Sequence, residues 1–327
     1  MQTLGLDPER TLTVLAAAGR APSVHNAQPW KFGLFEDRIE VCADVARRLP
    51  VADPEDRELR LGIGAALYNL RLALLDLGVR PLVTIRPWEH PGAEAVVRSG
   101  GRGALDERTG PLFRSIPARR TNRRPFSEAP IPADHRHRLT RVAEAEGAWL
   151  EIVDNPIQQS RIQRLLTEAH AIQVRDDAFR AEFSSWTGHD APAAEGVPLA
   201  SSGPAPEQQD RYVLRDFGAG RARQRWPGRD FEREPLLAVL ATHGDGEYAQ
   251  LRAGQAMEAV LLTATSLGLA ASFLSQVIEV EACRYELRRL FDDGLHPQTV
   301  LRLGFGSPVP TTPRRDTADL VVREVTA

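Results

Sequence analysis

The order of hydrophobic and polar positions along the chain predicts a mixture of helices and strands. After Asp7 and Pro8, which suit the N-cap and the first position of a helix, apolar residues recur at helical spacing up to Ala18. Two longer helical patterns cover residues 53–78 and 247–268, and in the first Gly62, Gly64, Ala65 and Ala66 would let another backbone approach closely. Further helices are predicted from Pro132 onward, over 158–180 and over 281–291.

Short apolar runs between turn signals predict the strands. Residues 30–41 predict two short strands joined by a turn at Glu36 and Asp37. Further strands are predicted from Pro81 onward and over residues 148–153, 236–242, 270–274 and 299–306. The small and polar stretch 92–110 predicts a linker or a surface loop. The mixture indicates an α+β fold.

Residues 184–234 interrupt this pattern. They are rich in Gly, Pro, Ala, Gln and Arg and have little periodicity. A loop of this length within a compact domain is uncommon and usually forms a lid or a disordered insert. We call residues 184–234 the insert.

The two long helical patterns resemble each other. Both begin Leu-Arg-x-Gly, at residues 59 and 251, which lie 192 positions apart, and both end Leu-Gly, at residues 77 and 267, which lie 190 positions apart. A two-residue gap reconciles the two offsets. A buried helix with small residues can match this far by chance. The alternative is that the chain contains two copies of one αβ unit, as when a dimer is fused into one polypeptide.

Composition and charge exclude several classes of protein. The 327 residues include 41 Lys and Arg against 44 Asp and Glu, and this net charge of −3 gives no overall attraction to nucleic acid or a membrane surface. Two cysteines, Cys42 and Cys283, are too few for a disulfide framework or a four-thiolate metal site. We see no signal peptide and no apolar run long enough to span a bilayer, so we expect a cytoplasmic protein.

Three motifs together resemble the FMN-dependent nitroreductase family. The loop Ala21–Trp30, Ala-Pro-Ser-Val-His-Asn-Ala-Gln-Pro-Trp, is similar to a flavin-contacting loop of that family. Residues 119–123, Arg-Arg-Thr-Asn-Arg, resemble its phosphate-binding start, and residues 302–315 resemble its last strand and basic FMN-phosphate segment. The Thr-Pro-Arg-Arg ending is most similar to the actinobacterial Acg subfamily of fused, two-half proteins. The resemblance covers the chain except for the insert.

The two halves depart from the family pattern in opposite ways. Residues 1–110 have the loop but lack the arginine-rich start, whereas residues 111–327 have the arginine-rich start but no such loop. The resemblance therefore implies a nitroreductase-like α+β fold in which two related halves form an intramolecular pseudo-dimer, with a lid-like insert. It also implies one FMN site per chain, built from both halves.

The resemblance further implies a role for each site residue. Arginine suits a phosphate group because its planar fork donates hydrogen bonds in pairs. Arg123 is expected near the pyrimidine end of the flavin, where reduced flavin carries negative charge. The backbone near Leu274 and Ser275 is expected at the nitrogen that accepts hydride. The FMN-phosphate residues are expected to be Arg119, Arg120, Thr121 and Arg315 or Arg314, and the loop residues against the flavin Pro22, Ser23, Asn26 and Gln28.

Some of these residues have simpler explanations. The basic segments could be solvated loops, and Asn26 could form an Asx-type turn. His25 is either a proton donor, given its ordinary pKa of about 6.5, or a loop histidine bonded to nearby backbone.

Other chemistries find little support. There is no His-Glu-x-x-His or Gly-x-Ser-x-Gly motif, and Gly62 and Gly64 lack the third glycine of a dinucleotide-binding loop. Residues 221–226, Arg-Ala-Arg-Gln-Arg-Trp, could bind RNA, but an exposed basic stretch is the simpler interpretation.

Three functions fit the resemblance. The first is an FMN oxidoreductase that passes hydride from NAD(P)H to a small nitroaromatic or quinone. The second is an FMN-sequestering protein whose insert covers the flavin. The third is a flavin dehydrogenase of natural-product biosynthesis. A fused chain of this kind is expected to be a monomer or a weak homodimer.

Overall fold

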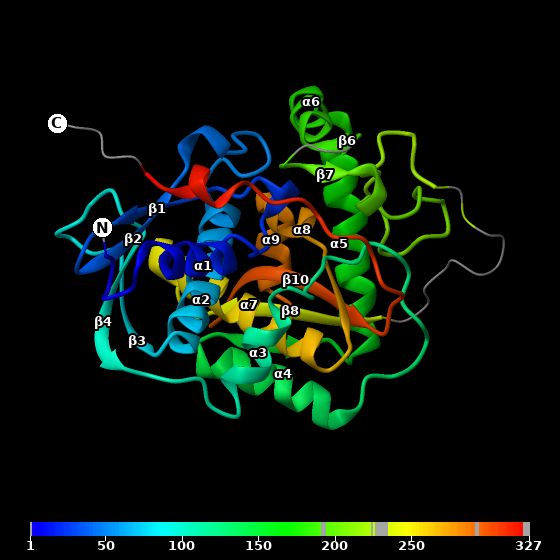
Figure 1. Ribbon diagram of the computed structural model, residues 1–327. Coiled ribbons are helices and arrows are strands. Elements are labelled where there is room, and N and C mark those ends of the chain that lie inside the picture. The colour runs from blue at the N-terminus through cyan, green and yellow to red at the C-terminus, as the bar shows by residue number, and fades with distance from the viewer. Residues whose placement is uncertain (1, 191–193, 224, 226–234, 292–293, 323–327) are drawn as a thin grey trace.

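Two long helices lie side by side at the centre of the protein and separate two β-sheets (Figure 1). The computed structural model describes residues 2–190, 194–223, 225, 235–291 and 294–322. The central helices are α2 (Arg57–Asp76) and α7 (Glu247–Ser266). The other helices are α1 (Pro8–Ala18), α3 (Thr109–Ser115), α4 (Ala133–Ala145), α5 (Pro156–Arg175), α6 (Asp177–Trp186), α8 (Gln276–Glu279) and α9 (Glu281–Arg288). Within these residues, no helix is long and apolar enough to cross a membrane.

Each of the two large sheets has four antiparallel strands. The first sheet has the order β1-β2-β4-β3 and the second the order β5-β8-β10-β9. The first sheet contains β1 (Trp30–Leu34), β2 (Arg38–Ala43), β3 (Val79–Ile85) and β4 (Ala95–Arg102). The second contains β5 (Trp149–Ile152), β8 (Leu236–Thr242), β9 (Ala270–Phe273) and β10 (His296–Gly304). Both sheets therefore place their first, second, fourth and third strands side by side.

The same order of elements occurs twice along the chain. The first half runs α1-β1-β2-α2-β3-β4, and the second runs α4-β5-β8-α7-β9-β10 with additional elements between them. Both central helices have 20 residues, and their bounds differ by a constant 190 positions. The repeat suggested by the sequence is thus present in the fold. The proposed two-residue gap is wrong, because Leu61 and Gly64 correspond to Leu251 and Gly254 without a gap.

The two central helices touch at their glycines. A Cβ atom placed on Gly64 would lie 2.3 Å from the carbonyl oxygen of Leu251, and one placed on Gly254 would lie 2.2 Å from the carbonyl oxygen of Leu61. No side chain can occupy such a position without separating the backbones. The reciprocal contact fixes how the two halves pack, and it lies in the main hydrophobic core.

Several predicted elements were confirmed and others were wrong. Helix α1 begins as expected, because the Asp7 carboxylate accepts a hydrogen bond from the Arg10 amide at 2.8 Å. The predicted linker at 92–110 instead contains β4, a central strand of the first sheet, and the start of α3. The glycines in this stretch are typical of a loop, so the sequence pattern did not indicate a strand. The predicted helix 158–180 is two helices, because the Asp176 side chain caps the start of α6.

The insert is partly regular. Its described residues include the end of α6, the two-stranded parallel sheet of β6 (Thr187–His189) and β7 (Val197–Pro198), and a short 3-10 helix at Leu199–Ser201. In Figure 1 these elements stand above one side of the second half, at the end of α5. Residues 191–193, 224 and 226–234 of the predicted insert lie outside the described residues.

The last segment of the chain returns to the first half. Val321 forms a parallel bridge with Phe32 of β1, and the Val322 amide donates a hydrogen bond to the Phe32 carbonyl at 2.9 Å. Figure 1 shows this segment, in orange and red, running from β10 across the molecule to β1. The segment that follows β10 therefore begins in the second half and packs against the first half.

The glycine contact between α2 and α7 yields a first prediction. Gly254→Ala should lower the free energy of unfolding by about 2–3 kcal/mol, because the added methyl group overpacks a rigid backbone contact. Urea unfolding followed by circular dichroism measures this change. The matched control is Gly92→Ala, where an added Cβ has no atom within 4 Å. Equal stability of the two variants would show that the helices do not depend on this contact.

Candidate functional site

Two adjoining cavities lie between the two halves of the chain. They share Pro22, Ser23, Thr121 and Arg123 in their walls, and we call the two adjoining cavities together the cleft. One cavity has largely apolar walls, and we call it the apolar cavity. The other is rich in arginine, and we call it the basic cavity.

The apolar cavity combines residues from both halves and from the insert. Pro22 and Gly62 come from the first half, Met257 and Phe273 come from the second, and Phe217 comes from the insert. The remaining wall residues are Ser23, Val24, His25, Glu58, Leu61, Thr121, Arg123, Arg215, Ser272, Ser275 and Thr299. Hydrophobic walls with a few polar groups are typical of a small-molecule site.

Buried arginines dominate the basic cavity. Arg119 is only 4% exposed, and its Nε and Nη1 atoms have no hydrogen-bond partner. Burial lowers the pKa of Arg119, although the nearby Glu258 opposes this change. Burial, followed by repulsion from Arg119, lowers the pKa of Arg314 to about 9. Arg20 and Arg120 complete the basic wall. Under-partnered buried cations are costly, and an anion in this cavity would relieve that cost.

The loop before β1 has an unusual backbone. His25, Asn26 and Gln28 have φ angles of 49°, 58° and 53°, in the left-handed region that side-chain-bearing residues seldom adopt. Such a conformation persists only where surrounding contacts hold it, and it often marks a functional site.

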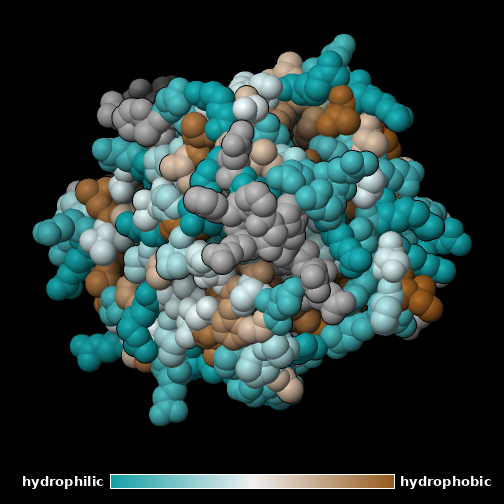
Figure 2. All heavy atoms as spheres, turned by 90° about the vertical axis from the view of Figure 1, so that its right-hand side faces the viewer, coloured by the Kyte–Doolittle hydropathy of each residue, from teal (hydrophilic) through white to brown (hydrophobic). Residues whose placement is uncertain are grey.

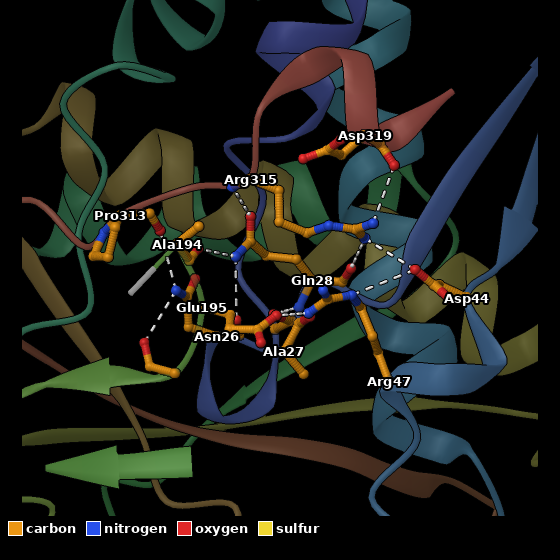
Figure 3. Close-up of polar contacts among 12 residues, drawn as sticks. Asn26, Ala27, Gln28, Asp44, Arg47, Ala194, Glu195, Pro313, Arg315 and Asp319 are labelled. Carbon is orange, nitrogen blue, oxygen red and sulfur yellow. Dashed lines mark hydrogen bonds and ion pairs between the residues drawn. The ribbon is translucent and has the colours of Figure 1, made fainter. Parts of the chain in front are cut away.

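The side chains of Asn26 and Gln28 provide these contacts. The Asn26 amide nitrogen donates to the carbonyls of Gly196 and Pro313, both at 3.1 Å, and its oxygen accepts from Arg314 at 2.9 Å. The Gln28 amide donates to the Ala194 carbonyl at 2.8 Å and accepts from the Arg315 amide at 2.9 Å. Figure 3 shows Asn26 and Gln28 between the insert and the C-terminal segment. They therefore join three distant segments of the chain.

The structure distinguishes the two candidate arginines of the C-terminal segment. Arg314 lines the basic cavity. Arg315 does not line either cavity in the described part of the chain, because its guanidinium binds the Asp44 carboxylate at 3.1 Å and donates to the carbonyl of Gln28. Figure 3 shows Arg315 beside Asp44. Of the two alternatives, only Arg314 is placed to contact an anion in the cavity.

Other expected residues fall in different places. Pro22, Ser23, Thr121 and Arg123 lie in the shared wall. Asn26 and Arg120 line the basic cavity, whereas Gln28 is fully buried and is not among the described wall residues.

The segment after β9 differs in detail from the expectation. The amide of Leu274 already donates to the Val300 carbonyl at 2.9 Å, so that N–H is not free for a ligand. Ser275 does line the apolar cavity, and its hydroxyl accepts a hydrogen bond from Arg215 at 3.1 Å.

His25 fits neither of the two sequence explanations. Its ring lies edge-on against Phe183 at 5.1 Å between centroids, and its Nε2 atom has no hydrogen-bond partner. Burial, with added repulsion from Arg215, lowers its pKa to about 3. His25 is therefore a neutral wall residue of the apolar cavity, held by aromatic packing.

Sequence reasoning missed several wall residues. Glu58 is 5% exposed, and burial and the nearby Glu279 raise its pKa well above the ordinary value. Arg215 of the insert forms a buried ion pair with Glu279, which follows β9. A polar residue within an apolar helical stripe, as at position 58, was the available signal. No sequence signal indicated the contacts of Arg215, because the insert lacks periodicity.

The insert closes one side of the apolar cavity. The guanidinium of Arg123 lies 4.3 Å from the centroid of the Phe217 ring and donates to the Ser201 carbonyl at 3.0 Å. Figure 2 shows the molecular face that carries the insert, which is mostly hydrophilic with scattered hydrophobic groups. Phe217 of the insert thus forms part of the cavity wall.

No group of three or more metal-ligating side chains occurs among the described residues.

No family model matches the chain. A protein of Mycobacterium tuberculosis strain H37Rv with the provisional name NAD(P)H nitroreductase is 32% identical over 330 residues, which is 98% of this chain and 93% of the relative. A second protein of that strain, provisionally named NAD(P)H nitroreductase acg, is 31% identical over 306 residues, 91% of each chain. The chain belongs to the nitroreductase family, which confirms the resemblance and the fold class.

Solved structures include similar chains. One is a nitroreductase with bound FMN from Desulfitobacterium hafniense, with a TM-score of 0.41 and 13% identity over 65% of this chain and 98% of that chain. Another is the NADPH:FMN oxidoreductase from Vibrio harveyi complexed with NAD+, with a TM-score of 0.40 and 12% identity over 66% of this chain and 78% of that chain.

The buried histidine yields a second prediction. Because the folded-state pKa of His25, about 3, lies below its ordinary value of 6.5, the unfolded chain binds a proton first as the pH falls. Relative to His25→Gln, the natural protein should lose about 1.4 kcal/mol of stability for each pH unit below 6.5. Chemical unfolding between pH 7 and 4 measures the difference. His137→Gln, at an exposed position of α4, is the control, and identical pH curves for natural protein and His25→Gln would refute the burial argument.

Proposed function

We propose that the chain binds one FMN in the cleft between its halves and uses it to transfer hydride from a reduced nicotinamide to a small aromatic or quinone-like acceptor. One observation carries the proposal: a cavity with buried, under-partnered arginines adjoins a cavity with largely apolar walls. This combination suits a cofactor with an anionic phosphate and a flat ring.

The basic cavity would hold the phosphate. Arg119 and Arg314 offer buried guanidinium groups, and Arg20 and Arg120 add positive charge at its edge. Nη1 of Arg119 and Nε of Arg314 have no hydrogen-bond partner and are donors that an anion can satisfy. Hydrogen bonds between arginine and phosphate are charge-assisted and therefore strong.

The apolar cavity would hold the ring. When bound, FMN supplies reversible two-electron chemistry, which no side chain can provide. Arg123 offers a cation in the shared wall, and burial followed by repulsion from Arg215 lowers its pKa to about 10, so it stays charged at neutral pH. A fixed cation there would stabilise negative charge on a bound ring. Phe217 and Met257 would exclude water from its surface.

The insert favours a second function, in which the protein retains FMN and turns over slowly. Phe217 closes part of the apolar cavity, and Arg215 anchors this segment through Glu279, a fully buried ion pair, and through the Gln173 side chain at 2.8 Å. Burial opposes ionisation of Glu279, but Arg215 lowers its pKa overall, so the pair is charged. An anchored cover of this kind suits a protein that retains FMN and turns over slowly.

The phosphate assignment yields a third prediction. Arg119→Ala should weaken FMN binding by about 1.5–3 kcal/mol, the range for a hydrogen bond to a charged group, as measured by flavin fluorescence titration. Arg114→Ala removes the same charge from an exposed position in the same basic stretch and should bind FMN normally. Equal affinity of the two variants would remove Arg119 from the phosphate site.

The two functions differ in turnover. If the oxidoreductase proposal is right, anaerobic stopped-flow mixing of FMN-loaded protein with NADH or NADPH should bleach the flavin absorbance rapidly, and a quinone should restore it. Flavin that binds but stays oxidised for minutes in both reductants would instead favour the storage function. A protein that remains colourless with excess FMN would contradict both.

A further inference from the structure

A buried carboxylate lies beside the main phosphate arginine. Glu258, in the middle of α7, is fully buried, and its Oε1 atom lies 3.6 Å from Nε of Arg119. Arg119 itself is 4% exposed. This separation is too long for a hydrogen bond, so the attraction between the two charged groups is electrostatic only.

The charged neighbours described for Glu258 are both arginines. Among the described residues, the charged or ionisable groups that act on it are Arg119 after α3, Arg314 of the C-terminal segment and Tyr68 of α2, with the polar Asn69 beside them. Burial is the largest influence and raises the pKa of Glu258 to about 7, although Arg119 opposes the rise. The carboxyl group is therefore poised between its two protonation states near neutral pH.

An anion in the basic cavity would change this balance. With the cavity free of anion, ionised Glu258 is the counter-charge nearest to Arg119. A phosphate dianion would engage Arg119 and Arg314 and place two negative charges near the same carboxylate. Like charges in a buried site favour protonation of one of them.

We propose that Glu258 is a positioning residue for Arg119 that takes up a proton when the phosphate of FMN enters the basic cavity. The inference rests on the proposed function, because it requires FMN to bind there. Before binding, the carboxylate holds the guanidinium in place. After binding, solvent supplies one proton to the carboxylate, and the phosphate replaces it as the counter-charge.

This exchange has a thermodynamic consequence. When binding takes up a proton, affinity falls as the pH rises above the pKa of the free group. FMN affinity of the natural protein should therefore decrease between pH 7 and 8.5, by up to about tenfold per pH unit. The second ionisation of the phosphate itself, near pH 6, lies below this window.

Isothermal titration calorimetry of FMN into flavin-free protein at pH 7.5 tests the proposal. Repeating the titration in buffers of different ionisation enthalpy gives the number of protons taken up. We expect between about 0.5 and 0.8 proton per FMN for the natural protein, because about a quarter of Glu258 is already protonated at this pH, and close to none for Glu258→Gln. Glu146→Gln is the matched control, because Glu146 pairs with Arg71 at 2.6 Å and lines neither cavity among the described residues.

Two further measurements make the outcome decisive. Riboflavin, which lacks the phosphate, should bind without proton uptake, so uptake with riboflavin would overturn the proposal. Glu258→Asp keeps a carboxyl group and should keep some proton uptake while binding FMN more weakly, so the proposal stays testable even if the Gln variant does not fold. FMN binding without proton uptake overturns this inference alone, whereas absence of FMN binding by the natural protein overturns the proposed function.

Discussion

The contact between Gly64 and Gly254 is the constraint on which the rest of the structure depends. It brings two helix backbones together so closely that neither position tolerates a side chain. Because each helix carries its own sheet, this contact sets the position of one half against the other. The cleft forms where Pro22 and Gly62 of one half face Thr121 and Met257 of the other. Small errors in helix packing would therefore be transmitted directly to the cleft.

A second feature of the protein is its concentration of charge in places shielded from water. Arg119, Arg215, Glu258 and Glu279 are each less than 10% exposed. Their burial costs stability unless partners or ligands compensate it. The pair formed by Arg215 and Glu279 is compensated within the chain and anchors the insert. The buried positive charge of the basic cavity is only partly compensated, as expected for a site that binds an anion.

The sequence predicted the fold class and several residues that line the cleft, but it missed some elements and wall residues. The long helices, the loop before β1 and the basic segment at Arg119 all carry local signals, because capping, small residues and charge clusters reflect nearby contacts. Strand β4 was missed because its glycines resemble a loop and only its neighbours in the sheet make it a strand. Arg314 lines the basic cavity and Arg315 does not. This difference depends on partners nearly 290 positions away in the sequence, which no local pattern encodes. Glu58 and Glu258 appeared only as polar residues in apolar helices.

The pairing of Val321 with Phe32 has a consequence for how the protein folds. The first sheet is composed of residues 30–102, yet its edge strand β1 gains its second neighbour only from Val321, 289 positions after Phe32. Arg314 and Arg315, which hold the loop before β1, belong to the same late segment. Contacts between such distant segments form late, because the intervening chain must first be ordered. The cleft between the halves is therefore complete only when the segment after β10 has docked on the loop before β1.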